Sequence, residues 1–283
     1  AVHHLLGETD QPEVRFARAA AEYSGCRLKE LIVEPSQRLP ATDRHPLTPR
    51  PFRQFLQPDI TSLFDNIPGI DGATVFTGQG GDHLFLTSNS PDGFYDYLAD
   101  HGPSPNALRE LSNASRLSGR SAIAVLRSVA DRPKSTGIIA ALETRLAEFG
   151  LEPGLAHQWL PDWATSPAGI PRGKAGHLSR LVHLYNLQEP LRRSATVDIC
   201  HPLIARPLID LSLQLPVYQL CAGGTSRGLA RLAFENDLPD VIRRRVTKGY
   251  ASGHFRQQTE ANRDQLDRTL RRGLLSKSGL LPS

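Results

Sequence analysis

Hydrophobic and polar residues along the first ninety positions follow two different periods. Valine and alanine recur at helical spacing across residues 13–25, and Gly25 supplies a stop signal. Two short runs rich in β-branched and apolar residues predict strands. Five prolines within seventeen residues predict a loop between them. The helices expected here span 13–25 and 52–67 (broken near Pro58), the strands 28–34 and 73–77, and the loop 35–51.

The pattern turns helical after residue 85 and is expected to stay so to the end of the chain. Proline and glycine punctuate it, and residues 150–175, rich in Pro, Gly and Trp, predict a loop or lid. The expected helices are 92–101, 119–130, 135–149, 176–188, 206–215, 226–236, 239–245 and 257–274. Helices alternating with strands at the front predict an α/β fold, a parallel sheet with flanking helices over 1–90 and a mainly helical part over 91–283.

The stretch TVFTGQGGDHLF, residues 74–85, places glycines where the second predicted strand ends. Ligands bind at the carboxyl ends of strands in an open parallel sheet. Gly78, Gly80 and Gly81 permit positive φ angles and a close approach of a ligand to the backbone. Their amides, with the N-terminus of a following helix, predict an anion site. A carboxylate beside a phosphate is typically a magnesium ligand, which makes Asp82 the candidate metal residue.

The same stretch also fits a purely architectural interpretation. A tight strand-to-helix turn would use the glycines for its backbone and Asp82 as the N-cap of the helix. The turn is not a Walker A loop, because no Gly-Lys-Ser/Thr follows, and it does not match the dinucleotide pattern G-x-G-x-x-G.

A basic segment near the C-terminus is the second candidate. Residues 231–255 contain three consecutive arginines ending at Arg245, followed by Lys248 and Gly249. Lysine acts as a mobile point charge toward a polyphosphate. The alternative is a solvated basic end of a helix, the more common fate of such a run.

Composition narrows the function classes. The formal net charge of +4 is too small for a dedicated nucleic-acid binder. No apolar run approaches the roughly 18 residues of a membrane span, and no signal peptide is apparent. Three scattered cysteines predict neither disulfides nor a zinc site, so a cytoplasmic location is expected. The chain starts at Ala1 and contains no methionine, so we expect it to be a piece of a longer gene product.

Three motifs in this order resemble the synthetase domain of the asparagine synthetase family. They are GQGGD at 78–82, HPLIARPLIDLSLQLP at 201–216, and the segment from Leu238-Pro239 through Arg245, Lys248 and Gly249. The resemblance covers residues 10–256 and implies an ATP-pyrophosphatase type of α/β fold. It also implies one synthetase domain over 1–283 that uses ATP and Mg²⁺ to adenylate a carboxylate, after which an amine displaces AMP.

The resemblance assigns roles to individual residues. Asp82 matches the second of two magnesium aspartates, and the backbone of Gly78, Gly80 and Gly81 would line the adenylate pocket. Lys248 matches the lysine that stabilises pyrophosphate and developing negative charge, and Arg245 precedes it in the same phosphate-contacting segment. Gln79 occupies the position of a candidate catalytic base.

Within the family, the residues of these stretches resemble those of the lasso-peptide cyclases most closely. This implies a precursor peptide as substrate, closed into a macrolactam, with a leader-peptide-binding protein and a leader protease as partners. Nucleic acid and membranes are not expected as partners. The alternatives are asparagine synthetase acting on free aspartate, another family amidotransferase, and a catalytically degenerate peptide- or protein-binding module.

The chain departs from the family pattern at three places. The phosphate loop SGG-x-DS with the first magnesium aspartate is not found, so this piece alone is expected to bind ATP weakly. A glutamine amide at Gln79 does not accept a proton at neutral pH, which leaves His83, Glu189 and Asp198 as weak base candidates. Cys200 and Ala205 replace an Arg and an Asp of asparagine synthetases, which favours the cyclase interpretation; Cys200 has no evident partner base for a nucleophilic role.

Overall fold

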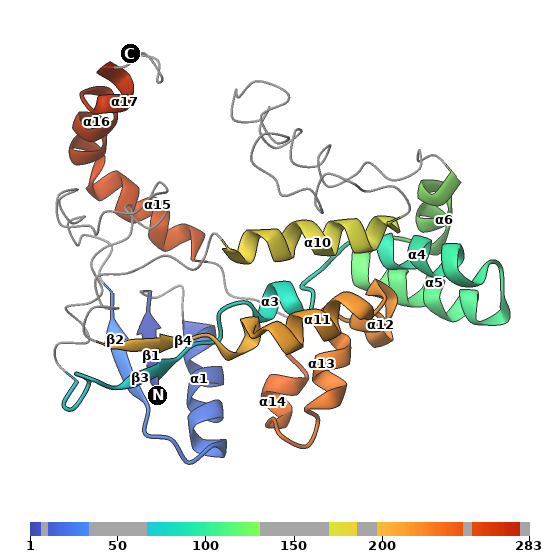
Figure 1. The fold of residues 1–283 in the computed structure, drawn as a ribbon, viewed down its shortest axis with the longest axis horizontal. Helices are drawn as coiled ribbons and strands as arrows, with labels where there is room; N and C mark the ends of the chain where they lie inside the picture. Colours follow the sequence, from blue (N-terminus) through green and yellow to red (C-terminus); the bar gives the residue numbers. More distant parts are fainter. Residues whose placement is uncertain (7–10, 34–66, 131–169, 186–196, 246–250, 278–283) are drawn as a thin grey trace. The chain divides into compact units, whose positions relative to one another are not determined.

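The computed structural model describes residues 1–6, 11–33, 67–130, 170–185, 197–245 and 251–277, and Figure 1 traces their fold. Chain contacts divide the molecule into two compact units. Unit 1 comprises Ala1–Val75, Glu189–Ile199 and Glu235–Ser283, and unit 2 comprises Phe76–Gln188 and Cys200–Phe234. The prediction of a single synthetase domain stays a prediction, and the helices expected at 52–67 and 135–149 lie outside the described residues.

Unit 1 begins with a parallel strand pair joined by a helix. Strand β1 (Val2–Leu5) pairs in parallel with β2 (Lys29–Ile32), with His3 opposite Glu30, and α1 (Gln11–Tyr23) connects them. The predicted helix 13–25 and strand 28–34 are therefore confirmed, whereas β1 was not expected. The two strands pair over their full lengths, from Val2 opposite Lys29 to Leu5 opposite Ile32. A bidentate Arg18–Glu30 ion pair links α1 to β2.

The apolar stripe of α1 packs inward as its spacing predicts, with one exception. Val14 and Ala21 are buried, together with Phe16, but Ala20 is exposed. Beyond the helix, Gly25 adopts a φ of 66°, and the amide of Cys26 donates to the carbonyl of Ala21. The predicted stop signal thus acts as a left-handed helix ending.

The C-terminal part of unit 1 is helical in short pieces. It contains α14 (Asp240–Arg243), α15 (Ser252–Ala261), α16 (Arg263–Arg271) and α17 (Leu274–Lys277). The single helix expected over 257–274 is wrong, since Asn262 leaves the helical conformation with a φ of −109° and a ψ of 16°. The helix expected over 239–245 is confirmed as α14.

A second pair of short strands stands at the junction of the sequence segments that form the two units. Strand β3 (Thr74–Phe76) pairs with β4 (Asp198–Cys200). The amide of Asp198 donates to the carbonyl of Ala73, and the amide of Thr77 donates to the carbonyl of Cys200, so both strands run in the same direction. The strand expected over 73–77 is confirmed, but the expectation of only helices after residue 85 is wrong at β4.

Unit 2 is otherwise helical (Figure 1). Helix α4 has the predicted bounds, and the expected helices 176–188, 206–215 and 226–236 are confirmed as α10, α11 and α13 with shifted ends. Helix α5 was not expected, and α10 begins at Arg172, inside the predicted loop 150–175. The elements are α3 (Gly81–Leu84), α4 (Asp92–His101), α5 (Pro105–Ser118), α6 (Ala122–Ala130), α10 (Arg172–Tyr185), α11 (Arg206–Gln214), α12 (Val217–Leu220) and α13 (Gly228–Ala233).

Three apolar clusters hold unit 2 together. Leu84 of α3 packs with Leu181 and Leu184 of α10. Phe94 of α4 packs with α5 and with Val125 of α6, which is fully buried. The third cluster joins Leu86, which follows α3, to α12. We call residues 78–81 the glycine turn. Two of the three clusters contain residues that directly follow this turn, Leu84 and Leu86, and so fix its place in unit 2.

None of the helices in the described ranges combines the length and the apolar character that crossing a membrane requires.

Candidate functional site

The glycine turn leads from β3 into the four-residue helix α3. Gly80 adopts a φ of 95° and stands at the N-cap, and its carbonyl accepts hydrogen bonds from the amides of His83 and Leu84. A Cβ on Gly80 would lie 2.2 Å from Cγ2 of Ile204. Glycine is therefore required here by conformation and by packing, as the architectural interpretation expects.

The other two glycines of the turn differ from Gly80. Neither Gly78 nor Gly81 has a positive φ, so Gly80 alone of the three adopts the conformation that all three glycines permit. A Cβ on Gly81 would lie 3.0 Å from Leu203, but one on Gly78 would meet no described atom within 4 Å. Packing against the described residues therefore does not explain why a glycine stands at position 78. Among those residues, its backbone is open to the close approach of a ligand.

A histidine from the segment after β4 fixes the start of the turn. The Thr77 hydroxyl lies 2.6 Å from Nδ1 of His201, and the backbone amide of Gln79 donates to the same hydroxyl over 3.3 Å. The sequence prediction missed both Thr77 and His201. His201 is the first residue of the motif 201–216, and Thr77 directly precedes the motif 78–82. The motifs were recognised, but neither residue was given a role.

Asp82 lies in the first turn of α3 rather than at its N-cap, so the N-cap alternative is wrong. Its Oδ1 accepts hydrogen bonds from Nη1 of Arg227 and from the Thr87 hydroxyl, both over 2.9 Å. The side chains of Asp82 and Arg227 are 34% and 33% exposed. The carboxylate is thus oriented by two donors and still reaches solvent.

Arg227 is presented to Asp82 by an unusual backbone. It adopts a φ of 59° at the N-cap of α13, and its amide donates to the carbonyl of Leu86. The next residue must be glycine, since a Cβ on Gly228 would lie 2.0 Å from the carbonyl oxygen of Ala222. Arg227 was not predicted from sequence, because nothing in its local pattern points to a partner 145 residues away.

The carbonyl that ends α3 is held by a buried polar pair. The Leu84 oxygen accepts a hydrogen bond from the Ser212 hydroxyl over 2.7 Å and lies 3.2 Å from Nε2 of His177. Burial, with the positive charge of Lys174, lowers the pKa of His177 to about 4. The ring is therefore neutral at physiological pH, with the proton on Nε2 when it donates to this carbonyl.

Buried Asp96 and half-buried Lys174 extend this contact to the neighbouring helices. Asp96 of α4, 2% exposed, accepts the amides of Gly173 and Lys174 over 2.7 and 2.8 Å, at the start of α10. Lys174 Nζ donates to the carbonyls of Ser212 and Leu215 at the end of α11. Burial raises the pKa of Asp96 to about 6 and lowers that of Lys174 to about 8. These hydrogen bonds link α4, α10 and α11.

The predicted phosphate residues in the basic segment have different outcomes. Arg245 forms a bidentate ion pair with Glu13 and stacks over the ring of Phe16, 4.1 Å from its centroid. Its guanidinium is thus engaged within unit 1, and phosphate binding by Arg245 stays a prediction. Lys248 and the base candidate Glu189 lie outside the described residues.

The remaining candidates have plain environments. Asp198 is exposed on β4, and Cys200, at the end of that strand, is half-buried. Cys26, Cys200 and Cys221 are all free thiols, as expected. His83 lies in α3 beside Asp82. None of these environments strengthens the case for Asp198 or His83 as a base or for Cys200 as a nucleophile.

Magnesium is the cation that the donor set at the turn fits. The described ranges contain no group of three or more His, Cys, Asp or Glu side chains that would hold a metal on their own. Magnesium commonly binds through one or two carboxylates and completes its shell with substrate phosphates and water. The single solvent-reaching carboxylate of Asp82 fits that pattern as one ligand.

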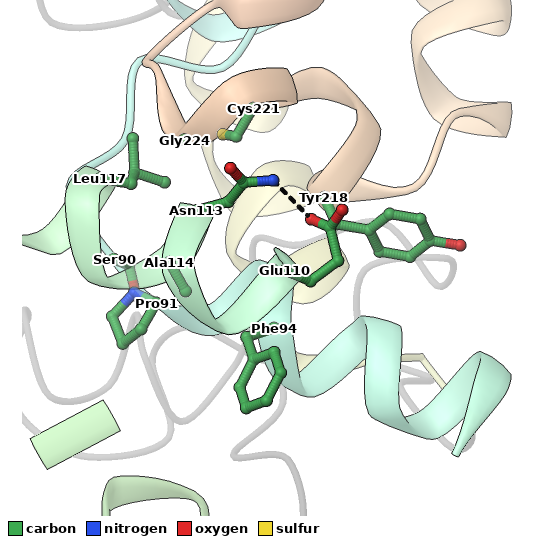
Figure 2. A pocket seen from close by; sticks show the side chains of 11 residues that line it. Ser90, Pro91, Phe94, Glu110, Asn113, Ala114, Leu117, Tyr218, Cys221 and Gly224 are labelled. Carbon is green, nitrogen blue, oxygen red and sulfur yellow. Dashed lines mark hydrogen bonds between the residues drawn. The ribbon is translucent and has the colours of Figure 1, made fainter. Parts of the chain in front are cut away.

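A small pocket lined by residues of α4, α5 and α12 is too small for a nucleotide. Figure 2 shows Phe94, Asn113 and Tyr218 among its lining residues, with Asn113 donating to Glu110 over 3.2 Å. Its volume of about 20 Å³ admits about one water molecule. The glycine turn therefore remains the candidate site.

Comparison with known proteins gives a match at the level of a family. A family model described as Asparagine synthase matches residues 3–282, nearly the whole chain. No curated protein and no solved structure gives a significant match.

Proposed function

Because the chain belongs to the asparagine synthase family, an ATP-dependent amide-forming ligase family, we propose that it forms part of a lasso-peptide macrolactam cyclase. In this proposal the side-chain carboxylate of a precursor peptide is adenylated, pyrophosphate leaves, and the N-terminal amine of the same peptide displaces AMP. A leader-peptide-binding protein and a leader protease are the partners that this role implies.

The observation that carries the proposal is that an open glycine and an oriented carboxylate stand in the same short segment. The backbone of Gly78 faces open space, and Asp82, four residues later, is oriented by the Arg227 guanidinium and the Thr87 hydroxyl. Both stand at the carboxyl end of β3 in a parallel strand pair, where ligands of parallel sheets bind. Arginine and threonine orient the carboxylate without removing it from solvent, as a cation ligand requires.

Each residue has a defined part in the proposed reaction. The amides around Gly78 would contact the nucleotide, and Asp82 would hold the cation. A magnesium ion there supplies positive charge that offsets the charge of the phosphates. Lys248 would stabilise the negative charge that develops on the leaving pyrophosphate. Gln79 would contact the reacting groups as a hydrogen-bonding amide, since it does not act as a base.

Two positions favour a peptide over free aspartate as substrate. Cys200, half-buried at the end of β4, and Ala205, exposed before α11, stand where the asparagine synthetase pattern has Arg and Asp. A small substrate with three charges needs charged partners, whereas a peptide side chain brings one carboxylate and an extended surface for contact.

ATP–pyrophosphate exchange by the full gene product tests this proposal. We expect exchange that depends on a precursor peptide bearing an acidic side chain. We also expect a peptide product whose mass is lower than that of the linear peptide by one water. Exchange with free aspartate, and asparagine formed from it with ammonia, would replace the cyclase proposal by asparagine synthetase. No exchange with either substrate would favour a degenerate binding module.

A further inference from the structure

Arg227 carries a feature that the proposed reaction does not use. Its Nη1 donates a hydrogen bond to Oδ1 of Asp82, the oxygen that also accepts a hydrogen bond from the Thr87 hydroxyl. A guanidinium and a divalent cation are both positive, and each needs the lone pairs of the same carboxylate. They are therefore competitors for Asp82 unless one of them moves.

The surroundings of Arg227 allow its side chain to move while its backbone stays. The amide is tied to Leu86, and the preceding Ser226 hydroxyl accepts the amide of Ser88, so the loop is fixed. The guanidinium, in contrast, is one-third exposed. Its Nε is buried and finds no hydrogen-bond partner in the part of the chain that the structure describes. Arginine carries five donors, and the contact with Asp82 leaves this one unsatisfied.

We propose that Arg227 is a positioning residue that couples cation and phosphate binding at the glycine turn. It holds Asp82 oriented, is displaced from the carboxylate by a divalent cation, and then donates to a phosphate oxygen. This inference rests on the proposed function. Its consequence is reciprocal: the cation binds weakly alone and more tightly with the polyphosphate, and the polyphosphate gains equally from the cation.

The chemistry of the guanidinium supports the second half of this exchange. Arginine recognises phosphate through planar, paired N–H donors, and its charge persists at every physiological pH. Once removed from Asp82 it would be an unpaired cation close to α3, the helix that directly follows the glycine turn. A phosphate there restores its charge balance, which lysine or glutamine at this position would do less well or not at all.

Binding of Mn²⁺ alone, followed by electron paramagnetic resonance on the full gene product, tests the competition. We expect Arg227→Gln to bind Mn²⁺ about five- to tenfold more tightly than the unmodified protein, a range typical of site coupling. Asp82→Asn should abolish this binding. Arg206→Gln is the matched control, because Arg206 is 91% exposed and pairs only loosely with Asp210 on its own helix.

The coupling itself is measured by repeating the Mn²⁺ titration with pyrophosphate present. Pyrophosphate should tighten Mn²⁺ binding in the unmodified protein and in Arg206→Gln, and much less in Arg227→Gln. Unchanged or weaker Mn²⁺ binding in Arg227→Gln, or binding that survives Asp82→Asn, would overturn the inference. These outcomes are separate from the exchange assay, since a cyclase without this coupling would still exchange pyrophosphate.

Thermal unfolding guards against a trivial explanation. Arg227→Lys keeps the charge but loses the planar pair of donors, so it should compete for Asp82 and bind phosphate less well. An Arg227→Lys variant with the midpoint of the unmodified protein and with reduced coupling would support the proposal even if Arg227→Gln folds poorly. Full coupling in Arg227→Lys would overturn the role of the planar guanidinium.

Discussion

The Ser212 hydroxyl donates to the carbonyl of Leu84 over 2.7 Å, which joins α11 to the last residue of α3. His177 Nε2 lies 3.2 Å from the same oxygen, and all three side chains are buried. The helix that carries Asp82 is only four residues long, so it has little stability of its own. Its position is therefore set by this buried contact and by the packing of Leu84.

Removal of the Ser212 hydroxyl should destabilise unit 2. We expect Ser212→Ala to lower the free energy of unfolding by about 1–3 kcal/mol, because a buried acceptor loses its shortest hydrogen bond. Urea denaturation measures this change. Ser179→Ala is the control, since that hydroxyl donates within its own helix at a solvent-exposed site; an equal loss in both variants would contradict the special role of Ser212.

Asp96 should make unit 2 less stable as pH rises through the acid range. Burial raises its pKa from 3.8 to about 6 in the folded state, so its protonated form is favoured there. Its contribution to stability is fully present below pH 3.8 and is lost as pH rises through about 6. The unfolding free energy of Asp96→Asn minus that of the unmodified protein should therefore rise between these limits, by on the order of 1–3 kcal/mol. A flat or falling difference would contradict the raised pKa.

His177 should have the opposite effect over nearly the same pH range. Burial lowers its pKa from 6.5 to about 4, so the folded state favours the neutral ring. Its contribution is fully present above pH 6.5 and is lost as pH falls through about 4. The unfolding free energy of His177→Gln minus that of the unmodified protein should fall as pH rises from 4 to 6.5. Urea titrations at a series of pH values test both variants, and equal signs for the two would refute this assignment.

Gly80→Ala should destabilise the turn strongly. The positive φ adds strain, and the new Cβ would lie 2.2 Å from Ile204. Together these predict a loss of about 2 kcal/mol or more in the free energy of unfolding. Gly72→Ala separates the two causes, because Gly72 has a φ of 73° and no described atom near its Cβ; it should lose about 1 kcal/mol. Similar losses at both positions would show that the clash with Ile204 is relieved.

Local sequence signals predicted α4 fully and left α5 unnoticed. Helix α4 has an apolar stripe and a glycine at its end, and its bounds agree with the prediction. Serines and asparagines dilute the pattern of α5, although Pro105 at its start and Gly119 after its end are standard helix signals. Strands β1 and β4 have four and three residues, too few for a period, and they exist through pairing with distant partners.

The site was predicted only as far as it is local. The glycines and Asp82 lie within five residues, so the turn was recognisable. The need for glycine at Gly80, however, comes partly from Ile204, far along the chain. Arg227 contacts Asp82, and His177 and Ser212 contact the carbonyl of Leu84. These contacts with α3 arise from tertiary packing, which spacing in the sequence does not indicate. The family match over residues 3–282 confirms the family that the motifs indicated, whereas the roles of the individual site residues stay predictions.

Magnesium-dependent ATP binding to the full gene product, measured by calorimetry, tests the central claim most directly. Gly78→Val is the decisive variant, since a Cβ there would meet no described atom within 4 Å. We expect the fold to stay intact, which thermal unfolding can verify. We predict that the unmodified protein binds ATP with magnesium and that Gly78→Val weakens this binding at least about tenfold, which is about 1.4 kcal/mol. Equal ATP binding by a folded Gly78→Val variant would contradict the claim that the glycine turn forms the nucleotide site.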